Sequence, residues 1–506
     1  MPNSIVTSPQ IQKFIDIAAS TDEKAPLPDR KDWPADLKEI AFKIADLSGQ
    51  WNPVEVFTPE NYHSERDRFL EYFELGKIYN PKFEYKTNVK DILFVDDRTL
   101  RILLNQNRIN EPNDYRYFDF NHLDQIDIIP EIKKYLKYLL SEVRRFEPDN
   151  MAGRLARVAL YFKINDDMAS VELVEGIKEK DETKIAAALK QKYSGTDESI
   201  LTLADKAYER LGKSECLKNN PGILNPEQKK YLRETKAGPK EIKEAFLWVL
   251  KKYQMLKCDD CPDGFNVMID SCFTSIDVRD KSKYGPTIGI PYDKVVSYEE
   301  LLKLIGHELE GHARQSINGQ RLFLLAGGPL KHDNEMLYEG LGKRYDDKIA
   351  TEIFGENSGM PGPYFTYAVK AAEDGKSFYE IFVQQLNLRI NILKQKKKYN
   401  HVKYAEAKNS AWKTTYRVMR GHINTYNTAK FAMAKDLAYL RGWQMDCELL
   451  LIEAGYINEC GIVDFKSMSL LAKMDFDESN LPIKYINAAK DYLFEKLMPK
   501  MTASLN

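Results

Sequence analysis

The sequence predicts an α+β protein that is predominantly α-helical, with one small antiparallel sheet. Three observations lead to this fold class. Most of the chain repeats apolar residues at the three- and four-residue spacing of amphipathic helices. Residues 264–292 instead alternate apolar and polar side chains between Gly, Pro and Asp, as short strands do. The next stretch, residues 301–318 (LLKLIGHELEGHARQSIN), has the pattern of a helix and bears two of the seven histidines.

Composition is that of an ordinary globular protein. Hydrophobic residues make up 43% and charged residues 30% of the 506 residues, which allows a large core. The 74 basic and 76 acidic residues leave a net charge of −2, so we expect neither nucleic acid nor membrane as a partner. No apolar run approaches the roughly 20 residues that span a bilayer. Six cysteines are few for this length, and no signal-peptide pattern begins the chain, so we expect a cytoplasmic protein.

We expect two regions. Residues 1–125 form a helical and mixed N-terminal region without a recognisable chemical motif. Residues 126–506 form a second region, which begins with a helical lead-in over 126–255. Its sheet and histidine-bearing helices follow over 264–352, and a helical part over 364–506 completes it. The sequence makes no prediction about oligomeric state.

Three short strands are expected over Phe265–Asp270, Thr274–Val278 and Thr287–Pro291. Ser297 and Glu300 then form a capping box, in which Ser297 is the N-cap of the next helix. The sheet therefore leads directly into the histidine-bearing helix. This order of elements is the one found in zincin-type peptidases, an argument from fold analogy.

The helix that follows holds His307, Glu308 and His312. Two imidazoles with a glutamate between them are the usual parts of a hydrolytic zinc site, but the familiar spacing H-E-x-x-H has one residue fewer. On a regular α-helix, five positions correspond to a rotation of about 140°, so the two imidazoles would not share a face. We therefore expect a π-type turn near Gly311. A regular helix there would instead mean a surface helix with two unrelated histidines.

A catalytic zinc ion takes three protein ligands and keeps one position for water. Glu335 and Glu339 lie four residues apart on one face of a predicted helix, and either carboxylate is a candidate third ligand. Gly340, beside Glu339, lets two helices approach closely. His332 is assigned to the start of this helix. The spacing leaves the choice of glutamate open, and a solvated helix face is the alternative.

Several motifs together resemble one family. HELEGHARQ followed by YEGLG is similar to the family whose bacterial members carry a QEGLA motif and whose animal members are the microtubule-associated tyrosine carboxypeptidases. KYSGTD at 192–197 resembles the Y-G-x-P-D element of that family. RVMRG at 417–421 and FAMAKDLAYLRG at 431–442 resemble its R-V-x-R-G and F-x-x-K-D-x-x-Y-x-x-G segments. The motifs occur in the family order over roughly residues 130–455, and the first 125 or so residues have no counterpart.

The resemblance implies a zincin-like core with one Zn²⁺ per chain. It makes His307, His312 and Glu339 the metal ligands and Glu308 the catalytic base. It also favours Glu339 over Glu335, which is then expected to lie behind the ligands. Two positions depart from the QEGLA motif, because Tyr338 replaces its glutamine and Gly342 its alanine. Neither departure removes a ligand, so both bear on the substrate pocket.

The implied activity is that of a carboxypeptidase that acts on a peptide or protein C-terminus and, in the animal members, removes a tyrosine. Such an enzyme needs a cation to hold the terminal carboxylate. The candidates for substrate binding are Arg417 and Arg420, three apart, and Lys435 and Tyr439, four apart. The alternative is that the arginines pair with helix carboxylates and the tyrosine belongs to the core.

Two other functions fit the same residues. One is an endo- or aminopeptidase with the same site chemistry. The other is a zinc-binding regulatory or interaction protein without turnover, because the bacterial members are labelled as modulators of another protein's expression. A run of seven lysines over 394–413 either attracts acidic peptide tails or is a solvated helix face, and we favour the solvated face.

Overall fold

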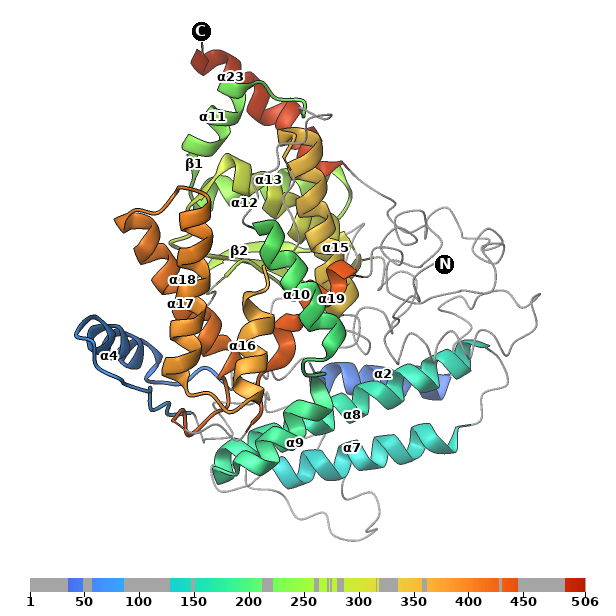
Figure 1. The fold of residues 1–506 in the computed structure, drawn as a ribbon. Helices are drawn as coiled ribbons and strands as arrows, with labels where there is room; N and C mark the ends of the chain where they lie inside the picture. The colour runs from blue at the N-terminus through green and yellow to red at the C-terminus, as the bar shows by residue number, and fades with distance from the viewer. Residues whose placement is uncertain are drawn as a thin grey trace, which may run out of the picture.

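The computed structural model describes residues 35–48, 57–85, 128–146, 151–211, 222–258, 264–270, 273, 275–279, 286–314, 316–317, 335–356, 362–426, 430–444 and 487–505. These residues are mostly helical, with a few short strands, as predicted (Figure 1). His332 and the side chains of Glu335 and Tyr338 lie outside the description.

The helices before the sheet are α2 (Ala35–Ser48), α4 (Tyr62–Glu74), α7 (Ile128–Arg145), α8 (Met151–Glu179), α9 (Glu182–Lys192), α10 (Glu198–Leu211), α11 (Pro226–Glu234) and α12 (Pro239–Lys252). The helices after it are α13 (Tyr298–Leu304), η3 (Ile305–Ala313), α15 (Glu335–Lys348), η4 (Ile349–Phe354), α16 (Tyr364–Glu373), α17 (Phe378–Gln395), α18 (His401–Val418), η5 (Ala434–Leu437), α19 (Ala438–Gln444), α22 (Ala488–Tyr492), η7 (Leu493–Leu497) and α23 (Met498–Leu505).

The main sheet has the strand order β2–β4–β3 and is mixed, not antiparallel as predicted. β4 (Thr287–Pro291) lies in the centre, parallel to β2 (Asn266–Asp270) and antiparallel to β3 (Asp277–Arg279). The chain reaches the far edge with β3 and then returns to the centre, so β2 and β4 run in the same direction. Alternating side chains predict where strands lie, but they contain no information about their order.

The centre of this sheet is fully covered. All five residues of β4 are buried, and helix α12 packs against both β2 and β4. The edge strand β3 packs against η3, the helix that carries the histidines. A second, two-stranded antiparallel sheet pairs β1 (Lys236–Ala237) with β5 (Val296–Ser297), immediately before α13. The two sheets therefore fix where the histidine-bearing helix begins.

The described residues contain two large hydrophobic cores and a smaller one between α10 and α19. One contains the sheet together with α12, α13, η3 and the C-terminal helices. The other joins α2 and α4 to α7, α8 and α9 and to α16, α17 and α18. In it the ring of Phe69 on α4 lies 4.8 Å from the Phe382 ring and 5.1 Å from the Trp412 ring, measured between centroids. The N-terminal helices thus share a core with residues more than 300 positions later, although the predicted boundary at residue 125 stays a prediction.

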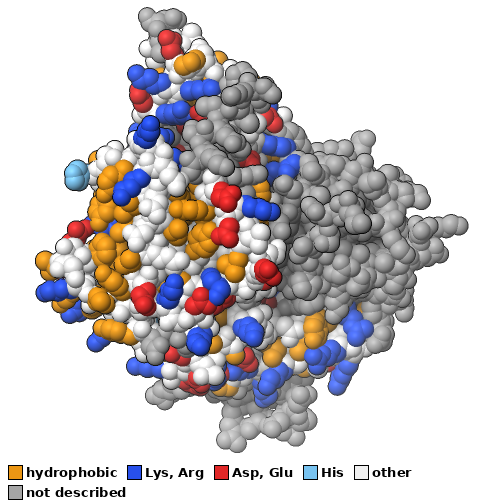
Figure 2. All heavy atoms as spheres, viewed as in Figure 1, with side chains coloured by type: hydrophobic (Ala, Val, Ile, Leu, Met, Phe, Trp, Pro, Cys, Tyr) orange, Lys and Arg blue, Asp and Glu red, His pale blue; other side chains and the backbone are white. Residues whose placement is uncertain are grey.

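Charged side chains of both signs are interspersed on the face shown in Figure 2, and hydrophobic side chains gather over α17 and α18. This mixture agrees with the near-zero net charge. Within the lysine run, Lys394, Lys397 and Lys398 are exposed, which agrees with a solvated face. No helix in the described part of the chain is both long and apolar enough to cross a lipid bilayer.

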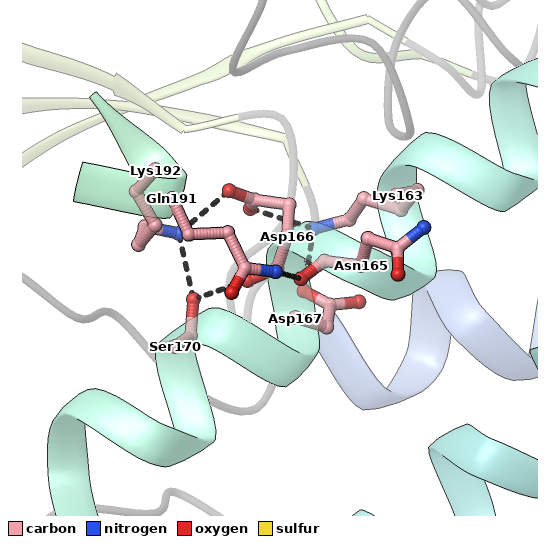
Figure 3. Close-up of polar contacts among 7 residues, drawn as sticks. All are labelled: Lys163, Asn165, Asp166, Asp167, Ser170, Gln191 and Lys192. Carbon is pink, nitrogen blue, oxygen red and sulfur yellow. Dashed lines mark hydrogen bonds and ion pairs between the residues drawn. The ribbon is translucent and has the colours of Figure 1, made fainter. Parts of the chain in front are cut away.

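Two buried lysines form a polar cluster on α8, and one of them, Lys192, links α9 to α8 (Figure 3). The Nζ of Lys192 lies 2.8 Å from Asp166 Oδ1 and donates a hydrogen bond to Ser170 Oγ at 2.7 Å. The Nζ of Lys163 lies 2.7 Å from Asp167 Oδ1. Because each buried charge depends on a partner, the loss of one member leaves the other uncompensated.

We expect Lys192→Met to lower the free energy of unfolding by about 3–5 kcal/mol, because a buried aspartate then loses its closest cation. Urea denaturation measures this change. The matched control is Lys184→Met, which removes a more exposed lysine that also pairs with carboxylates and is expected to cost less than about 1 kcal/mol. Adding Asp166→Asn to Lys192→Met should restore part of the loss. Equal effects of the two lysine substitutions would contradict this account.

Candidate metal centre

The helix that begins at Ser297 changes its winding at the histidines. Ser297 Oγ accepts a hydrogen bond from the Glu300 N–H at 3.1 Å, as expected for the N-cap of α13. From Ile305 to Ala313 the helix is a π-helix, η3. The predicted π-type geometry around Gly311 is therefore confirmed, although it extends over nine residues instead of a single turn. In a π-helix, positions five apart come into register, which is the spacing of His307 and His312.

Glycines let η3 pack closely against α15. A Cβ on Gly306 would lie 3.3 Å from Tyr345 Cβ of α15 and 2.4 Å from the side chain of Ile349, the first residue of η4. A Cβ on Gly311 would lie 3.4 Å from Gly342 Cα, an ordinary contact distance. The last turn of η3 is also held by Arg314, whose Nε donates to the Glu310 carbonyl at 2.7 Å. The unusual winding is thus supported by the helices around it.

Three candidate ligand atoms converge where η3 faces α15. Glu339 Oε2 lies 3.7 Å from His307 Nε2 and 3.9 Å from His312 Nε2. One ligand atom from each residue lies within 4.8 Å of the other two, and the imidazole rings are perpendicular. Ligands at 2.0–2.2 Å around a tetrahedral zinc ion are roughly 3.4 Å apart. The observed separations therefore fit a metal after a small contraction.

The carboxylate of Glu339 has the character of a metal ligand. Its Oε2 is buried without a hydrogen-bond partner although it lies beside two imidazoles. Burial raises the pKa of Glu339, but the neighbouring His307 and His312 lower it by more. The pKa of Glu339 is therefore lowered to about 2. A buried acceptor that stays charged and points between two ring nitrogens suits a divalent cation. Glu339 is thus the glutamate that the described residues bring to the histidines.

Behind His307 lies a carboxylate that the sequence analysis missed. Asp346 Oδ2 lies 3.3 Å from His307 Nδ1 and also accepts a hydrogen bond from Lys343 Nζ at 2.6 Å. Burial opposes a charged imidazole, but Asp346 and Glu339 together raise the pKa of His307 to about 10. Such a carboxylate fixes the ring orientation and directs the other nitrogen toward a metal. Its sequence signal is its position seven residues after Glu339, on the same helix face.

Glu308 lies near enough to His307 and Glu339 for their charges to affect its pKa. Burial raises the pKa of Glu308 to about 7. His307 lowers this pKa, whereas the Glu339 carboxylate raises it. Asp277, on the edge strand β3, adds to this increase. A carboxyl group that titrates near neutral pH can both accept and return a proton.

The glycines of the Glu339 segment have separate packing roles. A Cβ on Gly342 would lie 2.7–2.9 Å from ring atoms of His307, so this position has no room for alanine unless the imidazole moves. A Cβ on Gly340 would lie 2.6 Å from the Gly442 carbonyl oxygen, where α15 meets α19. The departure from the QEGLA motif at Gly342 therefore coincides with the close approach of a ligand ring.

Two of the predicted substrate-binding residues lie close to Glu339. Tyr439, on α19, has a pKa raised well above its usual value, chiefly by the Glu339 carboxylate and then by burial. Lys435 is near enough to contribute to the low pKa of Glu339. Lys343, from α15, places its Nζ 5.9 Å from the centre of the Tyr439 ring. A phenol and two cations thus surround the same carboxylate.

The two predicted arginines have different surroundings. Arg417 pairs with Asp436 and also hydrogen-bonds with the Tyr439 hydroxyl. Arg420 instead lies 5.0 Å from the centre of the Tyr416 ring, in the core shared with α4. Arg417 therefore belongs to the side-chain group around Tyr439, whereas the contacts of Arg420 within the described residues do not reach the ligands. Substrate binding by either residue stays a prediction.

The segment at 192–197 is tied directly to α19. Arg441 donates to the Ser194 carbonyl at 2.9 Å and to Asp197 Oδ2 at 3.3 Å. Asp197 Oδ1 in turn accepts from the Ile200 N–H at 2.9 Å in the first turn of α10. The Thr196 N–H donates to Glu373 at 3.1 Å, which adds α16 to the junction. Two distant sequence motifs thus meet beside the helix that carries Tyr439.

Comparison with known proteins adds no relative. No family model matches the chain, and no curated protein matches it.

We expect Asp346→Asn to weaken zinc binding by about 10- to 100-fold, because His307 loses the carboxylate that orients it. Competition with a chromophoric chelator measures the affinity. The control is Asp374→Asn, which replaces a half-exposed aspartate paired with Lys370 and should leave the affinity unchanged. If Asp346→Asn binds zinc as tightly as the unaltered chain, the orienting role is wrong.

Proposed function

We propose that this chain is a zinc-dependent peptidase, most consistent with a carboxypeptidase that removes C-terminal residues. The observation that carries the proposal is that Glu339 of α15 lies between His307 and His312 of the π-helix η3, with Glu308 nearby. The resemblance to the QEGLA and tyrosine carboxypeptidase family supports it independently of the geometry. His307, His312 and Glu339 would hold one zinc ion, and Asp346 would orient His307.

A zinc ion in this position supplies an acidified water molecule and a polarised scissile carbonyl. Glu308 accepts the proton of the attacking water and returns it to the leaving amine, a role that its pKa of about 7 favours. Tyr439 keeps its proton and is available as a hydrogen-bond donor beside Glu339. The edge strand β3 packs against η3 and offers main-chain groups to an extended peptide.

The charges near Glu339 support action at a C-terminus. Lys435 brings a positive charge close to this carboxylate, whereas the charge of Arg417 is already compensated by Asp436. We therefore propose that Lys435 holds the terminal carboxylate and that Arg417 positions Tyr439. Phe365 stacks on Tyr439 with ring centroids 6.5 Å apart, and this pair offers an apolar surface to an aromatic C-terminal side chain.

We expect Glu308→Gln to fold and to bind one zinc ion per chain while losing at least 100-fold in peptide hydrolysis, because glutamine cannot accept the proton of water. Mass spectrometry of a digested peptide library with free C-termini measures the products. The control is Glu300→Gln, which alters an exposed glutamate of α13 and should leave hydrolysis intact.

The same experiment separates the alternative functions. Release of single C-terminal residues by the unaltered chain supports the carboxypeptidase, and internal or N-terminal cleavage identifies a different peptidase with the same site. Stoichiometric zinc without any cleavage would overturn the peptidase and favour a regulatory protein. Full activity of Glu308→Gln would contradict the role of this glutamate.

A further inference from the structure

A second group of polar side chains, separate from the metal ligands, lies where α16, α17 and α18 meet. Its centre is Arg389 on α17, which is only 9% exposed. Its Nη1 donates to the carbonyl and to the Oε1 of Gln385, at 3.0 and 2.9 Å. Its Nη2 donates to Thr414 Oγ1 of α18 at 2.7 Å. These neutral acceptors hold the guanidinium in one orientation.

The charge of Arg389 has no counter-charge in the described part of the chain. The guanidinium lies 3.9 Å from the centre of the Tyr364 ring, and burial lowers the pKa of Arg389 to about 10, so it remains charged at neutral pH. Other arginines in similar settings have carboxylate partners, such as Asp436 for Arg417 and Asp197 for Arg441. A buried cation without a partner carries a large desolvation cost that an aromatic ring compensates only in part.

Two more features at this place favour a negative group. Gln385 is fully buried, its Oε1 accepts from Arg389, and the Nε2 of the same amide has no acceptor among the described residues. Helix α16 begins at Tyr364, the residue that stacks on the guanidinium, and its N-cap, Pro363, provides no capping side chain. The first N–H groups of this ten-residue helix receive no cap from the Pro363 side chain, and N–H groups at such a helix start can bind an anion.

We propose that Arg389, Gln385 and the first turn of α16 form a binding site for a small oxyanion, either a carboxylate or a phosphate group. A planar guanidinium that is already fixed by two helices can bind such a group through its remaining N–H donors. The site is distinct from the metal centre and does not depend on peptidase activity. Phe365, the next residue of α16, stacks on Tyr439, so an anion that orders the start of α16 also supports that ring.

The test measures thermal unfolding of the full chain in increasing phosphate, with chloride adjusted to constant ionic strength and pH. Because a ligand that binds only the folded state stabilises it, we expect a saturable rise in Tm of about 1–3 °C. The rise should disappear in Arg389→Gln and diminish in Gln385→Met, which removes the amide donors together with the Oε1 that accepts from Arg389. Arg233→Gln is the control, since Arg233 already has Glu299 and Glu356 as partners, and should respond as the unaltered chain does.

If Arg389→Gln fails to fold, Arg389→Lys and Gln385→Met decide the question, because both retain the packing and each should weaken the phosphate response. The site would be overturned if the unaltered chain showed no saturable response to phosphate or to a peptide with a free C-terminus, or if Gln385→Met and Arg389→Lys responded as strongly as the unaltered chain. Replacing phosphate by a short peptide with a free or an amidated C-terminus identifies the source of the anion. A response to the free acid alone assigns a peptide carboxylate, and a response to phosphate alone assigns a free phosphate-type anion.

Discussion

The π-helical winding of η3 is the constraint on which the candidate site depends. A regular helix would place His307 and His312 on different faces, whereas the observed winding brings their ring centroids to 4.7 Å. Such winding is rare and needs support. The support comes from Gly306 and Gly342, where a Cβ would crowd the facing helix, and from Arg314, which holds the last turn. The extra residue of the H-E-x-x-x-H motif is therefore accommodated by the π-helical winding, and the surrounding helices support that winding.

Helix α15 provides the side of the candidate site that faces η3. Glu339, Gly342 and Asp346 follow one another along the face that meets η3, where they provide a candidate ligand, room for the His307 ring and a carboxylate behind it. The opposite contact of α15, with α19, brings Tyr439 to the same place. Arg441 ties α19 to the segment at 192–197, so motifs separated by more than 200 residues meet at the helix that carries Tyr439.

The sequence predicted the features that follow from short-range spacing. The π-type turn and the helical fold are confirmed, and the strands lie where the alternation placed them, within a few residues. Strand direction was wrong because β4 enters the sheet between β2 and β3, a long-range feature without a local signal. Asp346 was missed because its role exists only once two helices pack. Arg420 lies only three residues after Arg417, but its side chain packs against the ring of Tyr416.

X-ray absorption at the zinc edge, on the full chain loaded with one equivalent of zinc, tests the central claim most directly. The account predicts a first shell of nitrogen and oxygen at about 2.0–2.1 Å, with the outer-shell scattering of two imidazole rings. Sulfur at about 2.3 Å, or a shell with one imidazole or none, would contradict the account, because it would mean that the π-helical turn does not bring His307 and His312 to the same ion.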